Sequence, residues 1–383
     1  MKRMIDFLMH ANEVSPLSAY SLKRLPALVW PAKYFLSIVL LMLAIVACNK
    51  NDDFGEITPE SSGYSSGNGV FIINEGNFGN GNGSLSFLNL DSLIMYNDIF
   101  YHANSRPLGD VPQSMAISGD TAWIVVNNSG KVEVVDLKNM SSISTVSGFL
   151  SPRFYLSVTT QKAYVSDFAD GGVSVVNKQN FSIEGKVHLG CSSEQMLLAD
   201  GKVFVAFWSN YGFSHLENNK LVVIDATDDQ VIDSVIVGKE PNSMVLDGGG
   251  KLWVLCSGGF AAEEKPSLWC INPINHEIIS SFTFPDINSS PTSLCANGSG
   301  DTLYFLDQGI FRLAIDSQQL PDEPVITEDE HLFYSLAVDP GTSIIYTSDA
   351  IDYQQRGLIL RYRQDGSFID SFRAGVIPGR FVF

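Results

Sequence analysis

From Gly69 to the C-terminus, one short apolar segment recurs seven times in the sequence. The seven copies read GVFIIN, TAWIVV, KAYVSD, KVFVAF, KLWVLC, TLYFLD and SIIYTS, and a second apolar segment follows each copy after a loop. Each copy is rich in β-branched and aromatic residues and is bounded by turn-forming residues, so we expect it to form a strand. An internal repeat of this kind constrains the fold more than any single motif does.

A third apolar segment precedes six of the seven copies. Its first apolar residues are Met115, Phe154, Met196, Met244, Leu294 and Leu336, which are spaced by 39, 42, 48, 50 and 42 residues. A weaker fourth segment, clearest as DSVIVG, SSFTFP and DSFRAG, ends the unit. Four strands in about 40 to 50 residues are typical of one blade of a β-propeller.

The C-terminal sequence RFVF supplies the segment that the first copy lacks. Only a polar, Gly/Ser-rich stretch precedes that copy, whereas Phe381 follows Leu336 by 45 residues. The sequence therefore predicts an all-β, seven-bladed β-propeller over residues 69–383, closed by the C-terminal strand pairing into blade one. Closure removes two exposed sheet edges. A β-sandwich is the alternative, but it predicts neither seven in-phase units nor the missing first segment.

The composition agrees with a turn-rich β protein and argues against a nucleic-acid partner. Hydrophobic residues make up 45% of the chain, charged residues make up 17%, and 32 glycines punctuate it. The formal net charge is −18. A surface this acidic repels phosphate backbones, so no nucleic-acid partner is expected.

The first 68 residues resemble an export signal followed by a tether. Basic residues precede the apolar stretch Tyr34–Ala47, which is too short to span a bilayer but has the length of a signal-peptide core. We interpret residues 1–47 as a lipoprotein signal peptide and Cys48 as the lipidated residue. A plain signal peptide and an uncleaved anchor are the alternatives. Residues 48–68 are expected to be a flexible lipidated tether, and its KNDD sequence resembles signals for export to the outer cell surface.

Four cysteines follow the tether: Cys191, Cys256, Cys270 and Cys295. Cys256 and Cys270 are expected on neighbouring strands of one blade, where an exported chain has the opportunity to oxidise them. Buried free thiols are the favoured interpretation. No Cys/His spacing indicates zinc.

One face of the predicted ring carries long loops with aromatic residues. The loops that join the second and third strands of each blade share this face, and four of them are far longer than a tight hairpin requires. Their aromatic residues are Phe78, Phe168, Trp208, Tyr211, Phe213, Phe260 and Tyr353. This cluster indicates a shallow apolar binding surface. The alternative is that the loops fold back over their neighbours.

The innermost strands are expected to begin on the same face, at the mouth of the axial channel. Their first residues include amides, a phenol and two guanidinium groups: Gln113, Arg153, Gln195, Asn242, Tyr334 and Arg380. Such groups suit a ligand that carries many carbonyls or a phosphate. The alternative role for each is to satisfy backbone groups between blades.

The sequence gives little support for catalysis. His215 and His331 are the histidines expected on this face, and they belong to different blades; His215 is interpreted as a solvated loop residue. No GxSxG, HExxH or P-loop motif is present, and no loop has the alternating ligands of a calcium site. We therefore expect neither an enzyme nor a bound metal or cofactor.

Four segments resemble a known family: NEGNFGNGNGSLSFLNL, RPLGDVPQSMAI, IVVNNSGKVEVVDL and the terminal VIPGRFVF. They are similar to YncE-like propeller lipoproteins of the DUF5074 type, and within these to the BtuG-type proteins that capture vitamin B12 and related cobamides. The resemblance implies a lipid-anchored outer-membrane protein that faces the cell exterior. It also implies that the protein binds a cobamide, or another bulky nutrient, and passes it to a TonB-dependent transporter. The cobamide is then a ligand and not a cofactor.

Two other classes of function stay open. A glycan-binding or structural surface propeller would use the same aromatic loops to stack on sugars. A propeller lyase or quinoprotein would need histidines, acids or a metal converging on the channel mouth, and the sequence shows no such constellation.

Overall fold

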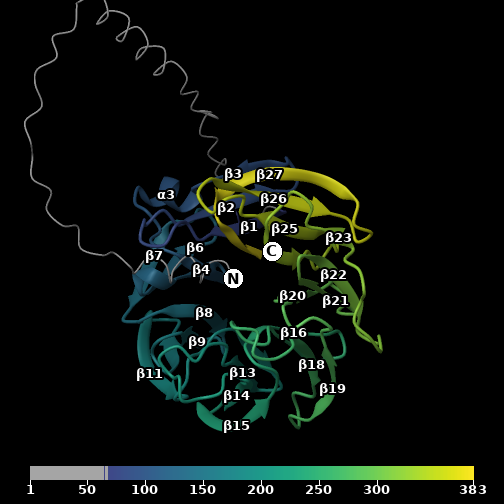
Figure 1. Ribbon diagram of the computed structural model, residues 1–383. Coiled ribbons are helices and arrows are strands. Elements are labelled where there is room, and N and C mark those ends of the chain that lie inside the picture. The colour runs from purple at the N-terminus through teal and green to yellow at the C-terminus, as the bar shows by residue number, and fades with distance from the viewer. Residues whose placement is uncertain (1–63, 65–67) are drawn as a thin grey trace, which may run out of the picture. The chain divides into compact units, whose positions relative to one another are not determined.

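The computed structural model describes Tyr64 and residues 68–383, which form seven four-stranded antiparallel sheets arranged as blades around a common axis (Figure 1). The innermost strands contact one another in the order β4, β8, β12, β16, β20, β24 and β28, and β28 in turn contacts β4. In every blade but the first, the strands follow chain order from the axis outward. The predicted all-β, seven-bladed propeller is therefore confirmed.

The strands of the seven blades, from the axis outward, have the following bounds. Blade one contains β28 (Pro378–Val382), β1 (Gly69–Asn74), β2 (Ser84–Asn89) and β3 (Ile94–Tyr96), and blade two contains β4 (Pro112–Ser118), β5 (Thr121–Val126), β6 (Lys131–Asp136) and β7 (Ser142–Ser147). Blade three contains β8 (Pro152–Ser157), β9 (Lys162–Asp167), β10 (Gly172–Asn177) and β11 (Ser182–His188), and blade four contains β12 (Met196–Ala199), β13 (Lys202–Ala206), β14 (Lys220–Asp225) and β15 (Gln230–Ile236). Blade five contains β16 (Pro241–Leu246), β17 (Leu252–Cys256), β18 (Ser267–Ile271) and β19 (Ile278–Thr283). Blade six contains β20 (Thr292–Ala296), β21 (Thr302–Leu306), β22 (Gly309–Ala314) and β23 (Ile326–Thr327), and blade seven contains β24 (Phe333–Val338), β25 (Ile345–Asp349), β26 (Arg356–Tyr362) and β27 (Phe368–Val376). The helix α3 (Ile99–Asn104) joins β3 to β4, and the 3-10 turn η1 (Asn127–Ser129) joins β5 to β6.

Burial explains why some strands are easier to recognise in the sequence than others. The second strand of a blade lies between two strands of its own sheet and between two neighbouring blades, and every residue of β17 is buried. The outermost strand β15, by contrast, exposes all but one of its seven residues. A buried strand must be apolar on both faces, whereas an outer strand needs only a few apolar contacts. The repeat is therefore clearest in the second strands and weakest in the fourth.

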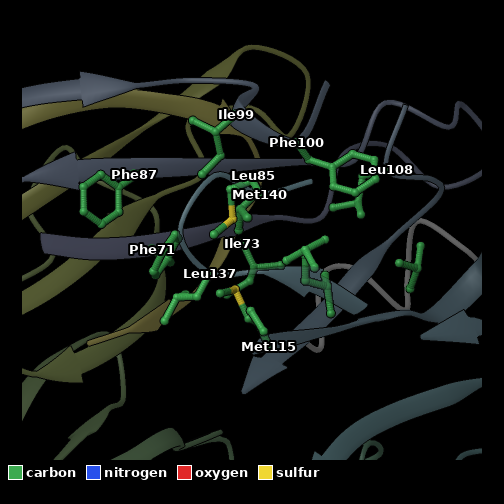
Figure 2. Close-up of a cluster of buried hydrophobic side chains, with 14 residues drawn as sticks. Phe71, Ile73, Leu85, Phe87, Ile99, Phe100, Leu108, Met115, Leu137 and Met140 are labelled. Carbon is green, nitrogen blue, oxygen red and sulfur yellow. The ribbon is translucent and has the colours of Figure 1, made fainter. Parts of the chain in front are cut away.

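Packing between blades one and two is representative of the core (Figure 2). Phe71 and Phe87 of blade one contact each other with ring centroids 4.8 Å apart, and they share one buried cluster with Met115 and Met140 from the β4–β7 region. Tyr64 packs on the edge of this cluster, with its ring 5.1 Å from that of Phe87. Full burial of one such side chain stabilises the fold by about 1.5–3 kcal/mol.

The C-terminal strand closes the ring, as the sequence predicts. β28 pairs antiparallel with β1, so that Val382 lies opposite Phe71, and Figure 1 shows the C-terminus beside β1. Beyond blade one, the rings of Phe381 and Phe383 lie 5.8 Å and 5.2 Å from that of Tyr346 in blade seven. The apolar C-terminus is therefore part of a sheet and of the junction between the first and last blades.

Several predictions concern residues outside the described part of the chain. These are the signal peptide over residues 1–47, lipidation of Cys48, and all of the tether over residues 48–68 except Tyr64 and Asn68. No helix among the described residues has the length and apolar character needed to cross a membrane.

The four cysteines of the propeller are free thiols. The register of blade five pairs Cys256 with Ser267 and Cys270 with Trp253, so the two cysteines are not opposite each other. Burial raises the pKa of the Cys270 thiol to about 11. The favoured interpretation of buried free thiols is confirmed for Cys191, Cys256 and Cys270, whereas Cys295 is a partly buried free thiol, and the disulfide does not form.

Deleting residues 378–383 removes β28 and should destabilise the propeller strongly. The four residue pairs between β28 and β1 and the contacts of the partly buried β28 side chains are lost, and the edge of β1 becomes exposed. We expect the free energy of unfolding to fall by about 4 kcal/mol or more, and the chain to self-associate. Calorimetry and size-exclusion chromatography measure both effects. The control Phe383→Ala removes one partly exposed ring and should cost about 1 kcal/mol or less. A truncated chain that melts like the full chain would contradict ring closure.

Candidate functional site

The innermost strands share a bulge near their starts. In six of the seven blades, the register between the innermost strand and the second strand shifts at this point. The shift falls at Gln113 in β4, at Arg153 in β8, at Asn242 in β16 and at Tyr334 in β24. A β-bulge changes the direction in which local side chains point. Because each innermost strand starts on the same face of the ring, the bulges present a set of polar side chains at one end of the axis.

Six residues form what we call the axial cluster: Glu75, Gln113, Arg153, Glu194, Tyr334 and Arg380. Arg153 joins three blades, because its Nε donates to Glu194 Oε1 at 2.7 Å and its Nη1 donates to Gln113 Oε1 at 2.7 Å. Glu194 and Gln113 are both buried. The Arg153–Glu194 contact is therefore a largely desolvated ion pair, which needs good geometry to offset the loss of hydration.

The other half of the axial cluster connects the last blade to the first. The Tyr334 hydroxyl donates to Glu75 Oε2 at 2.8 Å. Arg380 Nε donates to the backbone carbonyl of Gln113 at 3.1 Å. The guanidinium of Arg380 also lies over the ring of Phe154, with Cζ 4.5 Å from the centroid. The closing strand β28 therefore contributes a cation to the site as well as a strand to the sheet.

The charges of the axial cluster influence one another. Burial raises the pKa of Glu75, and the Tyr334 hydrogen bond, Arg153 and Arg380 oppose that rise without cancelling it. Burial likewise raises the pKa of Glu194, against the opposing effects of Arg153 and Arg380. Burial also lowers the pKa of Arg380, with Arg153 acting in the same direction. Two buried carboxyl groups and two partly buried guanidinium groups thus lie together in the axial cluster.

An aromatic patch lies beside the axial cluster. The ring of Phe168, the residue that follows β9, is stacked on Tyr211 with centroids 5.8 Å apart and tilted relative to Trp208 with centroids 6.1 Å apart. Tyr211 is 72% exposed. The Arg153 guanidinium lies 5.9 Å from the centroid of Phe168. The structure therefore brings four of the predicted site residues together from blades three and four, and connects the aromatic loops with the axial polar groups.

Phe213 and Tyr353 lie partly folded into the structure. Phe213 packs against the buried cluster of blades three and four. Tyr353 contacts Tyr334 with ring centroids 5.8 Å apart, and its carbonyl accepts a hydrogen bond from Asn77 Nδ2 at 2.5 Å. Loops from blades one and seven therefore meet near the axial cluster.

Three other predicted site residues, Phe78, Phe260 and Asn242, have different surroundings from one another. Phe78 is 58% exposed at the tip of the β1–β2 loop. The backbone N–H of Phe260 donates to Glu240, which holds the β17–β18 loop. Asn242 Nδ2 donates to the carbonyl of Pro291 at 2.8 Å and so joins blade five to blade six. Asn242 thus has the alternative role, that of satisfying a backbone group between blades.

Sequence reasoning missed both glutamates of the axial cluster. Glu75 immediately follows the buried strand β1, and Glu194 immediately precedes Gln195 and β12. Each lies beside a strand end on the same face as the predicted residues. Their position in the repeat could therefore have identified them as candidate site residues. Only their burial and their pairing with residues from other blades distinguish them from solvated loop acids.

No group of histidine, cysteine or acidic residues in the described part of the chain has the arrangement of a metal site. His331 Nδ1 lies 2.8 Å from Asp349 Oδ2, and its ring stacks on Phe333 at 5.9 Å. Asp349 also accepts hydrogen bonds from the backbone N–H groups of Leu332 and Ile351, so this pair holds the loop before β24.

Residues 68–363 match the family model described as a domain of unknown function, DUF5074. The chain belongs to the DUF5074 family. The match spans blades two to six in full, together with three of the four strands of blade one and of blade seven. It ends before β28, so the closing strand of this DUF5074 protein lies beyond the matched region. No curated protein matches the chain.

Solved structures similar to this DUF5074 protein share the fold at low sequence identity. A quinonprotein alcohol dehydrogenase-like protein from Bacteroides thetaiotaomicron is 14% identical, with a TM-score of 0.64 over 84% of this chain and 78% of its own. A functionally unknown protein from Desulfotomaculum acetoxidans is 12% identical, with a TM-score of 0.60 over 82% and 98%. Virginiamycin B lyase from Staphylococcus aureus is 14% identical, with a TM-score of 0.53 over 68% and 84%. At these identities the similarity is one of fold alone.

Replacing Tyr334 with Phe should make the stability more dependent on pH. Because burial raises the pKa of Glu75, its contribution to stability is complete below the unfolded value of about 4.3 and is lost as the pH rises through the folded pKa. The Tyr334 hydroxyl stabilises the ionised form, so its removal should cost about 1–2 kcal/mol near pH 8 and less near pH 4. Urea unfolding at both pH values measures the difference.

The control for this prediction is Tyr211→Phe, which removes an exposed hydroxyl and should change stability little at either pH. In a Glu75→Gln background, the pH-dependent part of the Tyr334→Phe effect should disappear. An equal cost at both pH values would show that the hydroxyl does not act through Glu75.

Proposed function

We propose that this protein is a surface lipoprotein that captures a cobamide, a vitamin B12-type corrinoid, and passes it to a TonB-dependent outer-membrane transporter. The observation that carries this proposal is the continuity between the aromatic patch and the axial cluster through Arg153 and Phe168. The mechanism is binding and transfer without making or breaking a covalent bond.

The chemistry of the face suits a corrinoid. A corrin ring is a broad, mostly apolar disc fringed with amides, so it calls for a wide apolar surface edged by hydrogen-bonding groups. Phe168, Trp208 and Tyr211 offer the apolar surface, and Gln113 and Arg153 supply polar groups beside it. The loops stand on a closed ring of sheets, which limits the ordering cost of binding.

The proposed location and transporter rest on the sequence. The lipoprotein-type signal sequence before Cys48, the tether that follows it and the resemblance to BtuG-type proteins support an anchored protein on the outer membrane, facing the exterior. Membership of the DUF5074 family is consistent with that proposal. A tether of about 20 residues would let the propeller reach a neighbouring transporter.

Cys48→Ser should release the protein from the membrane. Without the thiol no lipid can be attached, so we expect the protein in the soluble fraction after cell lysis, whereas the wild type should sediment with the outer membrane. Cys191→Ser is the matched control, because that cysteine lies inside the folded ring and should not change the fraction. A Cys48→Ser protein that stays with the membrane would exclude lipid anchoring at this residue.

The lipid-free protein should bind cyanocobalamin in calorimetry. Tyr211→Ala removes the most exposed ring of the aromatic patch and should weaken binding by about three- to tenfold, as expected for a lost aromatic contact. Phe368→Ala is the matched control: its ring is 54% exposed, but Phe368 begins β27 on the opposite face of the ring, so the substitution should have no effect.

The same titrations separate the alternative function. A glycan-binding propeller would give heat with neutral oligosaccharides and none with corrinoids, and Tyr211→Ala would then weaken sugar binding. Absence of heat with any corrinoid would exclude the proposed cargo.

A further inference from the structure

Arg380 has unused hydrogen-bonding capacity at the axis. Its Nε is bonded to the Gln113 carbonyl, and its plane is held against the ring of Phe154. Among the described residues, none forms a hydrogen bond with its Nη1 or Nη2 atoms or an ion pair with its guanidinium. The fork of donors that a guanidinium presents to an oxyanion is therefore left open.

The distribution of charge points to the same conclusion. Buried charges are normally paired. Arg153 has a direct carboxylate partner in Glu194, whereas Glu75 is bonded to Tyr334 and not to Arg380. Arg153 and Arg380 both donate hydrogen bonds to Gln113, so the two cations lie in one region, and Arg153 helps to lower the pKa of Arg380. The axial cluster thus holds one partly buried cation, Arg380, that has no ion-pair partner among the residues that the structure describes.

We propose that Arg380, together with Arg153, binds one oxyanion group of the captured molecule, a phosphate or a carboxylate, at the ring axis. The inference rests on the proposed function and makes it more specific, because a complete cobamide carries one phosphodiester in its nucleotide loop and a cobinamide carries none. The corrin would then lie over the aromatic patch while the phosphate reaches Arg380.

The carboxyl groups of the axial cluster make this binding depend on pH. Glu75 follows β1, Glu194 precedes β12, and Asp167 at the end of β9 also acts on Glu194. When ionised, these groups repel an incoming anion, and Tyr334 is the neutral group that faces Glu75. Because burial raises the pKa of both glutamates, they take up protons more readily than exposed glutamates do. Affinity for the anion should therefore increase as the pH falls.

Calorimetry with cyanocobalamin and dicyanocobinamide tests the proposal through two substitutions that should change the affinity for cyanocobalamin in opposite directions. Arg380→Gln should weaken cyanocobalamin binding by about tenfold or more and leave dicyanocobinamide binding unchanged. Glu75→Gln keeps the shape and an acceptor for Tyr334 but removes one negative charge, so it should strengthen cyanocobalamin binding. A loss of folding would weaken both, so the opposite signs distinguish a charge effect from damage to the ring.

Arg380→Lys is the second variant, in case the glutamine disturbs the closing strand. It keeps the charge but loses the planar fork, so its affinity for cyanocobalamin should lie between those of the wild type and Arg380→Gln. The proposal is overturned if Arg380→Gln binds cyanocobalamin like the wild type, or if it loses both corrinoids equally. It is also overturned if Glu75→Gln weakens binding.

A failure of the proposed function would be distinguishable from a failure of this inference. If the wild type binds no corrinoid, the cobamide proposal fails. The axial site is then tested by measuring the increase in melting temperature caused by inorganic phosphate and by trigalacturonic acid, at constant ionic strength. Stabilisation of the wild type but not of Arg380→Gln supports an oxyanion site, and the better of the two probes identifies the source as phosphate or acidic sugar. The inferred oxyanion site is overturned if the probes stabilise the wild type and Arg380→Gln equally, or stabilise neither protein.

Discussion

Pairing between the last strand and the first is the interaction on which the rest of the structure depends. β28 supplies the innermost strand of blade one, and its terminal phenylalanines also contact Tyr346 in blade seven. A chain of seven sheets without that pairing would have two open edges and one incomplete blade. Closure makes each blade a neighbour of two others, so that each second strand is buried on both faces. The same geometry fixes the loops of one face around a common axis.

The closing strand is also part of the candidate site. Arg380 lies opposite Ile73 in the β28–β1 ladder, and it reaches Gln113 in blade two and Phe154 in blade three. Ring closure and assembly of the axial cluster are therefore one structural event. A site built in this way has its charged groups on the innermost strands or beside strand ends, and preorganisation of this kind reduces the cost of binding.

The balance of charges at the axis gives the site its chemical character. One ion pair is complete, one glutamate is held by a phenol, and one guanidinium rests on an aromatic ring. Placing two buried carboxyl groups and two partly buried guanidinium groups together is costly for folding unless the charges are paired. Their retention beside an exposed aromatic patch is easier to explain by recognition of a ligand than by stability. The wider similarity to solved propellers shows the fold only, so the functional proposal depends on these residues and on the lipoprotein-like leader.

The sequence by itself determined the fold, because every blade repeats the same local pattern and the missing first strand had one possible donor, the segment containing Phe381. It also determined that Gln113, Arg153, Tyr334 and Arg380 lie on one face, because they occupy equivalent positions in the repeat. Only the tertiary structure decided which equivalent residues meet: Asn242 joins two blades, whereas Arg380 faces the axis with open donors. It also added Glu75 and Glu194, which the sequence reasoning had missed. The physical reason is that charge pairing and desolvation depend on distance and burial, and ring closure brings residues as far apart in sequence as Glu75 and Arg380 into one cluster at the axis.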